Sequence, residues 1–254
     1  MKEHGVTIQS VERALRILDC FTGKEQELGI TEIAGRMGLG KSTVYGLVNT
    51  LLVTGYLEQN PDSKKYCLGL KLFEMGNIVQ RRMDVRTAAG SYLRQLSEET
   101  RLTVHMAVYR DGQVIYIDKV DAPDSRIVYS QVGKVAPIYC TGIGKAILAW
   151  LPEKERQWLL SGERAAMTPH TIVERAALEA ELAEIRKNGY SMDREELEIG
   201  LRCVGAPVFD AGGHPIAAIS ASGTVGNLSE DREKNIQKKI CEIALAISAK
   251  MGYK

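Results

Sequence analysis

The sequence of 254 residues lacks the features that mark several large protein classes. No stretch approaches the roughly 18 uncharged apolar residues of a transmembrane helix, and the N-terminal 21 residues contain no apolar run typical of a signal peptide. The five cysteines are odd in number and form no CxxC pair, so neither a disulfide framework nor a zinc site is indicated. We therefore expect a cytoplasmic protein with reduced thiols, no metal, no cofactor and no membrane attachment.

An excess of charge of one sign is also missing. The chain has 33 Lys and Arg against 32 Asp and Glu, a net charge of +1. This balance argues against a uniformly cationic nucleic-acid binder and against a polybasic membrane binder. The charges are unevenly shared, since residues 1–82 hold eleven basic and nine acidic side chains. A small local DNA-binding surface is therefore compatible with near-neutrality.

Length and patterning predict an α+β protein of two domains. Residues 10 to about 70 show short helical periods that end in a hairpin-like stretch, and residues 71–101 are helical and charged. Beyond residue 103 the pattern alternates between strand-like and helical segments. The strand-like runs are 105–120, 136–140 and 203–222, and the helical ones are 143–151, 153–161, 174–188 and 229–251.

The first zone carries the pattern of a winged helix-turn-helix. Ser10 is expected to cap a first helix, and Thr31 a second one that ends at the glycine-containing turn 38–40. A third helix is expected from Lys41 to just before Gly55. Its inward stripe would be Val44, Leu47, Val48, Leu51 and Leu52, and its outward stripe Ser42, Tyr45, Gly46, Asn49 and Val53.

That outward stripe suits a DNA groove. Hydroxyl groups and free N–H groups at a helix start can meet phosphate, and Asn49 can read adenine. The following strand, turn and strand form a wing whose turn is succeeded by two lysines. The candidate DNA-binding residues are Thr31, Lys41, Ser42, Thr43, Tyr45, Asn49, Lys64 and Lys65. The alternative is a three-helix unit that serves only to dimerise.

Longer motifs resemble a known family. Residues 30–45 (ITEIAGRMGLGKSTVY) and 55–76 resemble the DNA-binding half of the IclR family of bacterial transcription regulators. Residues 133–150, 189–210 and 219–223 resemble the effector-binding domain of the same family, so the resemblance spans nearly the whole chain. KLFEMG, IVYS at 127–130 and the closing ISAKMGYK look most like the subgroup that responds to 2-keto-3-deoxygluconate.

The resemblance implies a winged helix-turn-helix domain over 1–70, a linker helix over 71–90, and a GAF-like α/β effector-binding and oligomerisation domain over 91–254 with a mostly antiparallel sheet. It also implies homodimers or homotetramers on palindromic double-stranded DNA operators. The implied effector is a small carboxylate, with 2-keto-3-deoxygluconate as the candidate. Family members often carry arginine where this chain has Gly46, so one cationic side chain is absent from the outward stripe.

The effector contacts follow from the same resemblance. The segment 141–145 has the pattern of a strand-to-helix turn, whose backbone N–H groups can hold an anion. It is not a phosphate-binding loop, because alanine follows Lys145. The family holds its effector with this turn, an acid, a cysteine and two serines. The corresponding residues here are Gly142, Ile143, Asp193, Cys203, Ser220 and Ser222.

Each of these residues also has a structural interpretation. Cys203 could be a small buried hydrophobe, Asp193 a solvated carboxylate at a helix start, and the serines ordinary strand residues. Arg126, Arg202 and Lys145 could pair with an effector carboxylate or with the many nearby glutamates.

Two other functions were open to the sequence. An enzyme could use Cys140 or Cys203 with His105, or the acids of 193–196. No nucleophile elbow or dinucleotide fingerprint accompanies them, so we expect no enzyme. A DNA-binding protein with a purely oligomerising C-terminal domain is the second alternative. The function predicted is a sequence-specific transcriptional regulator, a repressor, whose operator affinity is controlled by a small carboxylate such as a sugar acid.

Overall fold

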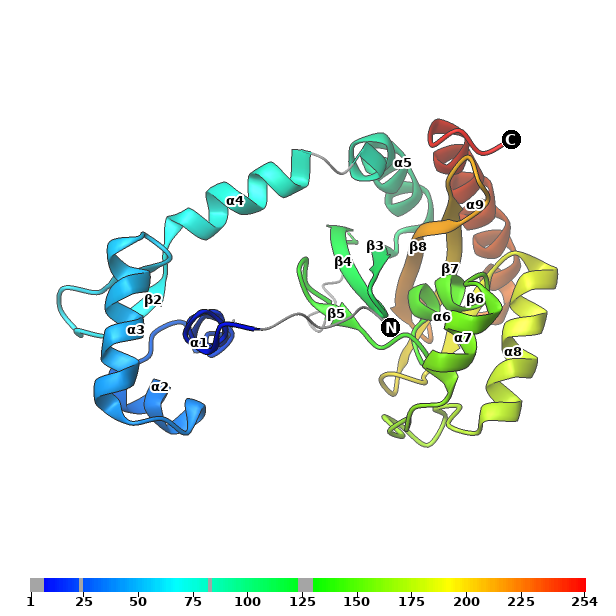
Figure 1. Cartoon of the computed structure of the whole chain (residues 1–254). Coiled ribbons are helices and arrows are strands. Elements are labelled where there is room, and N and C mark those ends of the chain that lie inside the picture. Colours follow the sequence, from blue (N-terminus) through cyan, green and yellow to red (C-terminus); the bar gives the residue numbers. More distant parts are fainter. Residues whose placement is uncertain (1–6, 23–24, 82–83, 123–129) are drawn as a thin grey trace. The chain divides into compact units, whose positions relative to one another are not determined.

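The protein is described from a computed structural model that covers residues 7–22, 25–81, 84–122 and 130–254 (Figure 1). The chain divides after residue 82 into two compact units. The first unit is helical with a two-stranded sheet, and the second is an α/β unit with a six-stranded antiparallel sheet. The predicted two-domain α+β architecture is therefore confirmed.

The first unit has the element order of a winged helix-turn-helix. Its elements are α1 (Gln9–Leu18), α2 (Ile30–Met37), α3 (Lys41–Val53), β1 (Leu57–Gln59), β2 (Tyr66–Leu68) and α4 (Leu70–Arg81). Strands β1 and β2 are antiparallel, and Tyr66 also bridges to Leu28. A shared core of fully buried side chains from the helices and the wing, among them Ile17, Ile33, Val44 and Leu57, holds the unit together.

Helix α3 matches its prediction. It begins at Lys41, and its buried residues are Val44, Val48 and Leu51. The backbone N–H of Tyr56 reaches back to the carbonyl oxygen of Leu51, and Gly55 has φ +79°. This is the left-handed ending for which glycine is favoured.

The starts of α1 and α2 differ from the predictions. Ser10 lies inside α1, which begins after Ile8, and Thr31 lies in the first turn of α2, which begins after Gly29. The N–H of Gly29 donates to Glu32 Oε2 at 2.7 Å. A carboxylate three residues into the helix thus does the capping that was assigned to the threonine.

The second unit contains the elements that build the sheet and cover it. They are α5 (Asp84–Thr100), β3 (Thr103–Arg110), β4 (Gln113–Val120), β5 (Val135–Ala136), α6 (Gly142–Leu148), α7 (Glu153–Leu160), α8 (Arg175–Asn188), β6 (Ser191–Arg194), β7 (Leu201–Phe209), β8 (Pro215–Thr224) and α9 (Glu230–Lys250). The strand order is β5-β4-β3-β8-β7-β6, with every pair antiparallel. Sequence analysis missed β6.

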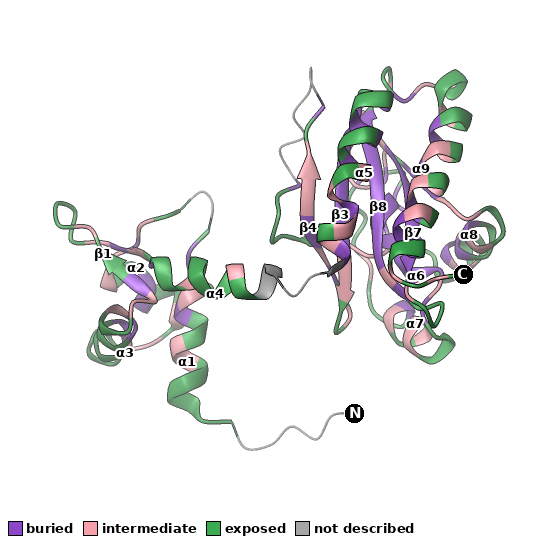
Figure 2. Ribbon diagram, turned by 90° about the horizontal axis from the view of Figure 1, so that it is seen from above, coloured by how far each residue is buried: buried purple, intermediate pink, exposed green. Residues whose placement is uncertain are grey.

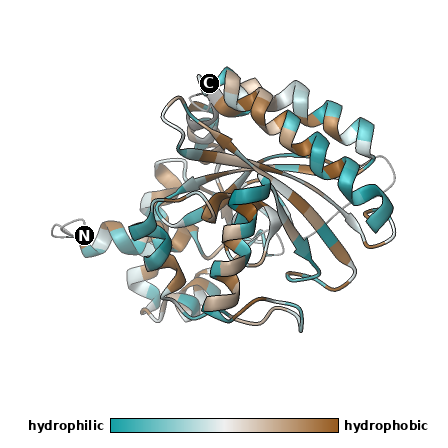
Figure 3. Ribbon diagram, turned by 90° about the vertical axis from the view of Figure 1, so that its right-hand side faces the viewer, coloured by the Kyte–Doolittle hydropathy of each residue, from teal (hydrophilic) through white to brown (hydrophobic). Residues whose placement is uncertain are grey.

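The two faces of this sheet differ in chemistry. One face carries Met106, Val204, Ile219 and their neighbours, which pack with α5 and α9 in a dry core. Helix α6 packs on the opposite face against β7 and β8. Figure 2 shows the central strands as the buried layer of the unit. Hydropathy along α9 shifts from hydrophilic residues at its start to hydrophobic residues near its end (Figure 3).

Candidate functional site

The predicted DNA-contact residues lie on one small region of the first unit. The side chains of Lys41, Ser42, Thr43, Tyr45 and Asn49 are all exposed on α3, with Tyr45 59% accessible. Among the described residues, these side chains have no hydrogen-bond or ion-pair partner. A helix surface of hydroxyl, amide and ammonium groups that is free of partners can take phosphate oxygens and base edges.

The two wing lysines are not equivalent. Lys65 Nζ lies 3.2 Å from Glu32 Oε2, so this cation is tied to α2. Lys64 is exposed, with φ 56°, and its ammonium pairs with no described residue. The turn itself is ordered by Asn60, whose side-chain oxygen accepts from the backbone N–H groups of Asp62 and Ser63. The wing therefore presents one unpaired cation and one paired cation.

In the second unit, the sheet face beneath α6 is polar. Strand pairing places Asp193 opposite Cys203, Cys203 opposite Ser222, and Ser222 opposite Thr103. A neighbouring row runs through Ser191, Gly205, Ser220 and His105. Laterally paired residues point to the same side of a sheet, as do residues two apart on one strand. We call the side chains of these two rows the polar sheet face; all are nearly or fully buried.

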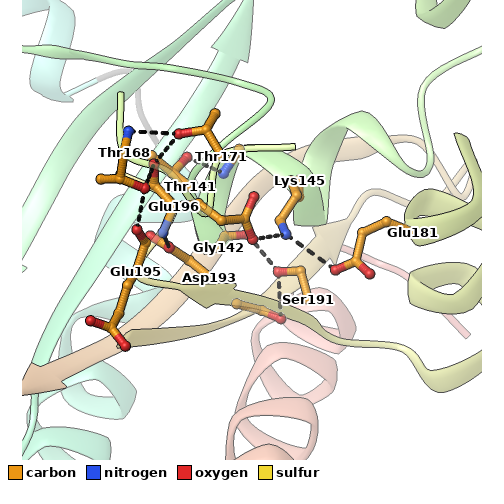
Figure 4. Close-up of polar contacts among 12 residues, drawn as sticks. Thr141, Gly142, Lys145, Thr168, Thr171, Glu181, Ser191, Asp193, Glu195 and Glu196 are labelled. Atoms are coloured by element: carbon orange, nitrogen blue, oxygen red, sulfur yellow. Dashed lines mark hydrogen bonds and ion pairs between the residues drawn. The ribbon is translucent and has the colours of Figure 1, made fainter. Parts of the chain in front are cut away.

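The start of α6 lies directly on this face. The side chain of Thr141 caps the helix by accepting from the N–H of Gly144 at 2.9 Å. Ser191 Oγ donates to the carbonyl oxygen of Gly142 at 2.5 Å (Figure 4). The N–H groups of Gly142 and Ile143 find no hydrogen-bond partner in the described part of the chain. Two buried amide donors are therefore available beside the polar sheet face.

Asp193 is a buried strand residue. It is 2% exposed, and its Oδ1 accepts from the backbone N–H of Glu196 at 2.7 Å. Burial raises the pKa of Asp193 to about 7, against the lowering effects of that N–H and of Lys145. The interpretation of Asp193 as a solvated carboxylate at a helix start is wrong, because β6 carries it into the sheet.

Lys145 is saturated by acids. It is fully buried, and its Nζ contacts Glu196 Oε1 at 2.5 Å and Glu181 Oε1 at 3.1 Å (Figure 4). The expectation that a nearby glutamate would pair with it is confirmed. Burial raises the pKa of Glu196, and the charge of Lys145 opposes that rise. Thr171 Oγ1 donates to the carbonyl oxygen of Glu196, so the turn that follows β6 is held from two sides.

The structure gathers most of the predicted effector residues. Asp193, Cys203 and Ser222 form one row, Ser220 lies in the next, and a Cβ on Gly142 would lie 3.2 Å from that of Cys203. Ile143 is buried in the core between α6 and the sheet. Arg202 falls on the opposite face, because it alternates with Cys203. Arg126 and residues 127–129 of the IVYS motif lie outside the described residues.

Sequence reasoning missed two neighbours of this face. His105 had been weighed only as a partner for a cysteine, whereas its hydrogen bonds go to Ser130 at 2.6 Å and Ser222 at 3.5 Å. The ring of Tyr116 on β4 lies 5.5 Å from the His105 ring. The alternation within 103–120 indicated which side chains share one face of the strands. Only the pairing of β3 with β8 shows that this is the face that carries Ser220 and Ser222. Burial raises the pKa of the Cys140 thiol to about 12, which opposes a nucleophilic thiolate there.

Two kinds of feature are absent from the described ranges. No group of three His, Cys, Asp or Glu side chains is placed to hold a metal ion. No described helix is both long and apolar enough to cross a bilayer.

Comparisons with known proteins cover both units. The model of the IclR helix-turn-helix domain matches residues 10–61, and that of the bacterial transcriptional regulator IclR C-terminal matches 78–249. The HTH-type transcriptional regulator XynR of Escherichia coli is 41% identical over 97% of this chain and 98% of its own length. The HTH-type transcriptional regulator KdgR of Escherichia coli is 38% identical over 97% of this chain and 94% of its own length. The crystal structure of the Thermotoga maritima IclR superposes with a TM-score of 0.80 at 35% identity, covering 97% of this chain and all of that one.

Proposed function

Because the chain belongs to the IclR family of bacterial transcriptional regulators, it is a DNA-binding regulator and not an enzyme, and we propose that a small carboxylate effector controls its affinity for an operator. We further propose that it acts as a repressor in the cytoplasm. The effector would bind on the polar sheet face, beside the start of α6.

The observation that supports an effector site is a set of buried polar groups without protein partners. The N–H groups of Gly142 and Ile143 make no hydrogen bond to any described residue, although both residues are buried. Buried backbone donors are almost always satisfied in folded proteins. Two unsatisfied amide donors, with the hydroxyl of the buried Ser220 on the same sheet face, are the arrangement that an anionic ligand would complete. A purely oligomerising domain has no need for such a surface.

The effector chemistry follows from the charges of the site. Amide and serine donors would take the carboxylate, and Asp193 would take hydroxyl protons of a hydroxylated chain. With a pKa of about 7 for Asp193, both its protonation states are accessible near neutral pH. Lys145 is occupied by Glu196 and Glu181, so it is not free to neutralise the ligand. A monoanionic sugar acid fits these conditions, and 2-keto-3-deoxygluconate is our candidate.

We assign operator binding to α3 and the wing. The exposed groups of Ser42, Thr43 and Asn49 would enter a major groove, with Lys41 and Lys64 on the backbone phosphates. Tyr45 and Thr31 flank them, and Lys65 would contribute only after its pair with Glu32 opens. Because few cations are offered by one head, specific affinity requires two heads on a palindromic site.

The first unit carries exposed apolar side chains that a second copy of the chain could cover. Ile8, Val11 and Leu15 follow a helical spacing along α1, and their side chains are 67%, 53% and 58% exposed. On α4, Leu70 and Phe73 are about equally open, at 70% and 69%. Exposed large apolar side chains at such density mark association surfaces. We propose that they bury against a second chain in a homodimer, or in a homotetramer built from two dimers.

Control by the effector requires a difference between two states. A ligand shifts an equilibrium only if it binds one state better than the other. We propose that the linker predicted at 71–90, which includes most of α4, the start of α5 and two residues outside the described ranges, sets the spacing of the two heads, and that the effector prefers one spacing. By reciprocity, operator DNA would then change effector affinity by the same factor.

Thermal-shift screening of the full-length protein against sugar acids and short oxo-acids tests the effector. A specific ligand should raise the melting temperature, with the rise growing as the logarithm of its concentration above Kd. The hit is then added to operator-binding titrations. We expect it to lower operator affinity, as repression relieved by an effector requires.

Asp193→Ala assigns the site. The variant should bind operator DNA like the wild type but lose the response to the effector, while Asp231→Ala, an exposed aspartate at the start of α9, should retain it. A full response in Asp193→Ala would exclude the polar sheet face as the effector site. Absence of any acid that shifts the wild type would leave the domain with only an oligomerising role.

A further inference from the structure

The polar sheet face continues past the residues that the family resemblance implies. His105 on β3 pairs laterally with Ser220, and Tyr116 on β4 pairs with Ala107, so both side chains lie on the α6 side. The two rings are 5.5 Å apart and tilted by 52°. Polar groups therefore extend from β6 across the sheet to β4. From β8 to β4 this adds two strand spacings, or about 10 Å.

Tyr116 has open space beside it. It lines a depression of about 260 Å³ together with Val135, Ala136, Pro137, Leu197 and Glu198. Only 7% of the residue is exposed, yet its hydroxyl forms no hydrogen bond with any residue that the structure describes. Burial raises the pKa of this phenol, and negative charge on Cys203, Asp193 and Cys140 would raise it further. It is a protonated donor without a partner.

His105 is neutral, and only one of its two ring nitrogens makes a short hydrogen bond. Burial and the charge of Lys119 lower its pKa to about 3, against the opposing effect of Asp121. A neutral imidazole has one donor and one acceptor nitrogen. Nε2 is tightly bound to Ser130 at 2.6 Å, whereas Nδ1 lies 3.5 Å from Ser222 Oγ, at the limit of a hydrogen bond. Nδ1 and Ser222 Oγ can therefore both bind a ligand group that lies beside them.

The charges around this end of the face exclude a second anion. Lys119 is paired with Asp121 at 2.9 Å, and Lys145 with its two glutamates. Tyr116 and His105 supply neutral donors and acceptors instead. Hydroxyl groups match neutral partners without any cost of burying a charge.

We propose that Tyr116 and His105 form a second, uncharged subsite that recognises the hydroxylated far end of the effector and so selects a longer hydroxy acid over a short oxo-acid. This inference rests on the proposed effector site. Tyr116 would contact the ligand directly. His105 would act as a positioning residue, because it holds Ser222 and Ser130 and supports the Tyr116 ring.

The test compares acids of two lengths on the full-length protein by isothermal titration calorimetry. The probes are pyruvate, D-gluconate and 2-keto-3-deoxygluconate. Tyr116→Phe removes one hydroxyl and should weaken binding of the six-carbon acids about tenfold, the effect of one lost hydrogen bond, with pyruvate binding changed less than twofold. Tyr109→Phe is the matched control, since that hydroxyl already has a partner, Glu155, at 2.7 Å. It should leave every affinity unchanged.

Two conservative variants test the histidine. The amide of His105→Asn can reach the position of Nδ1, and that of His105→Gln the position of Nε2. Only His105→Asn should keep the ratio of six-carbon to three-carbon affinity, because it preserves the contact to Ser222. Melting temperatures report folding separately. A purely structural histidine would change stability and leave the ratio alone in both variants, which would overturn its assigned role.

The remaining outcomes are decisive. If wild type binds only pyruvate, or if Tyr116→Phe weakens all acids equally, the second subsite is wrong while the proposed effector site stands. If six-carbon acids bind and Tyr116→Phe leaves their affinity unchanged, the subsite is wrong as well. If the wild type binds none of the acids, this inference falls together with the carboxylate effector.

Discussion

Gly205 on β7 touches Gly142 at the start of α6 so closely that Gly205 has no room for a side chain. A Cβ on Gly205 would lie 2.5 Å from the carbonyl oxygen of Gly142 and 2.7 Å from Ser191 Oγ. Both obstacles are held in place, because Ser191 Oγ donates to that same carbonyl. The first turn of α6 therefore rests on the sheet backbone, and its free N–H groups are fixed above the polar sheet face.

Gly205→Ala should consequently displace α6. We expect a loss of about 1–3 kcal/mol in the free energy of unfolding, as overpacking of a rigid contact costs, and a larger loss of effector affinity. Urea denaturation and calorimetry measure the two effects. Gly90→Ala in α5, where the nearest atom would be 3.8 Å away, should be neutral or stabilising. Equal behaviour of the two variants would contradict the close approach.

The buried pair of Lys145 and Glu196 gives a second prediction. Lys145→Met leaves the carboxylate of Glu196 buried without its main partner, and removing one member of such a pair costs about 3–5 kcal/mol. The double variant Lys145→Met with Glu196→Gln should recover much of this loss, because the uncompensated charge is gone. Denaturant titration of the three proteins measures the recovery. A double variant no more stable than Lys145→Met would show that the pair contributes through packing alone.

The raised pKa of Asp193 predicts a specific pH dependence. An acid whose pKa is higher in the folded state contributes stability while it is protonated and loses that contribution as the pH rises through its folded value, here about 7. Asp193→Asn abolishes this titration. Relative to wild type, the variant should therefore gain about 2–4 kcal/mol between pH 4 and pH 8. Thermal unfolding across this pH range checks the difference, and a constant difference would mean that Asp193 ionises without penalty.

Gly46 allows the missing arginine to be restored. A side chain placed there meets no atom within 4 Å, so it would project into solvent on the exposed face of α3. Gly46→Ala should stabilise the helix by about 0.8–1 kcal/mol without changing the operator interaction. Gly46→Arg should add a phosphate contact in each head, raising operator affinity and steepening its salt dependence by roughly 0.9 per contact. If both variants bind alike, this position does not face DNA.

The wing lysines should differ in their effect on DNA. Lys64→Ala should flatten the salt dependence of operator binding by about one phosphate contact per head, because its cation is unpaired. Lys65→Ala should have a smaller effect, since DNA must compete with Glu32 for that ammonium. Lys154→Ala, at the exposed start of α7, is the control for general charge. Salt titrations of operator affinity compare the three variants. A greater effect from Lys65 than from Lys64 would reverse this view of the wing.

Local chemistry made much of the fold predictable. The helical periods at 41–53, 174–188 and 229–251 were recognisable because each combines a stripe of apolar residues with a stop or start signal nearby. The alternation at 105–120 and 203–222 likewise predicted strands. The sequence was a poorer guide to α1, because apolar residues occupy two sides of that helix. Val11 and Leu15 have helical spacing but are exposed, and Ile17 is the buried residue. Periodicity shows that a stripe exists, and not which partner covers it.

By itself the sequence determined the winged helix-turn-helix, the α/β domain behind it, and the family to which the chain belongs, because these rest on patterns within a few dozen neighbouring residues. Only the tertiary structure decided the chemistry of the polar sheet face. His105 meets Ser222 across 117 positions of the chain, and Lys145 meets Glu196 across 51. Burial and pKa depend on such distant partners, since a charge is desolvated by whatever packs around it. The neighbours of Asp193 in the sequence suggest a solvated carboxylate, but the distant segments that pack around it bury it inside the protein.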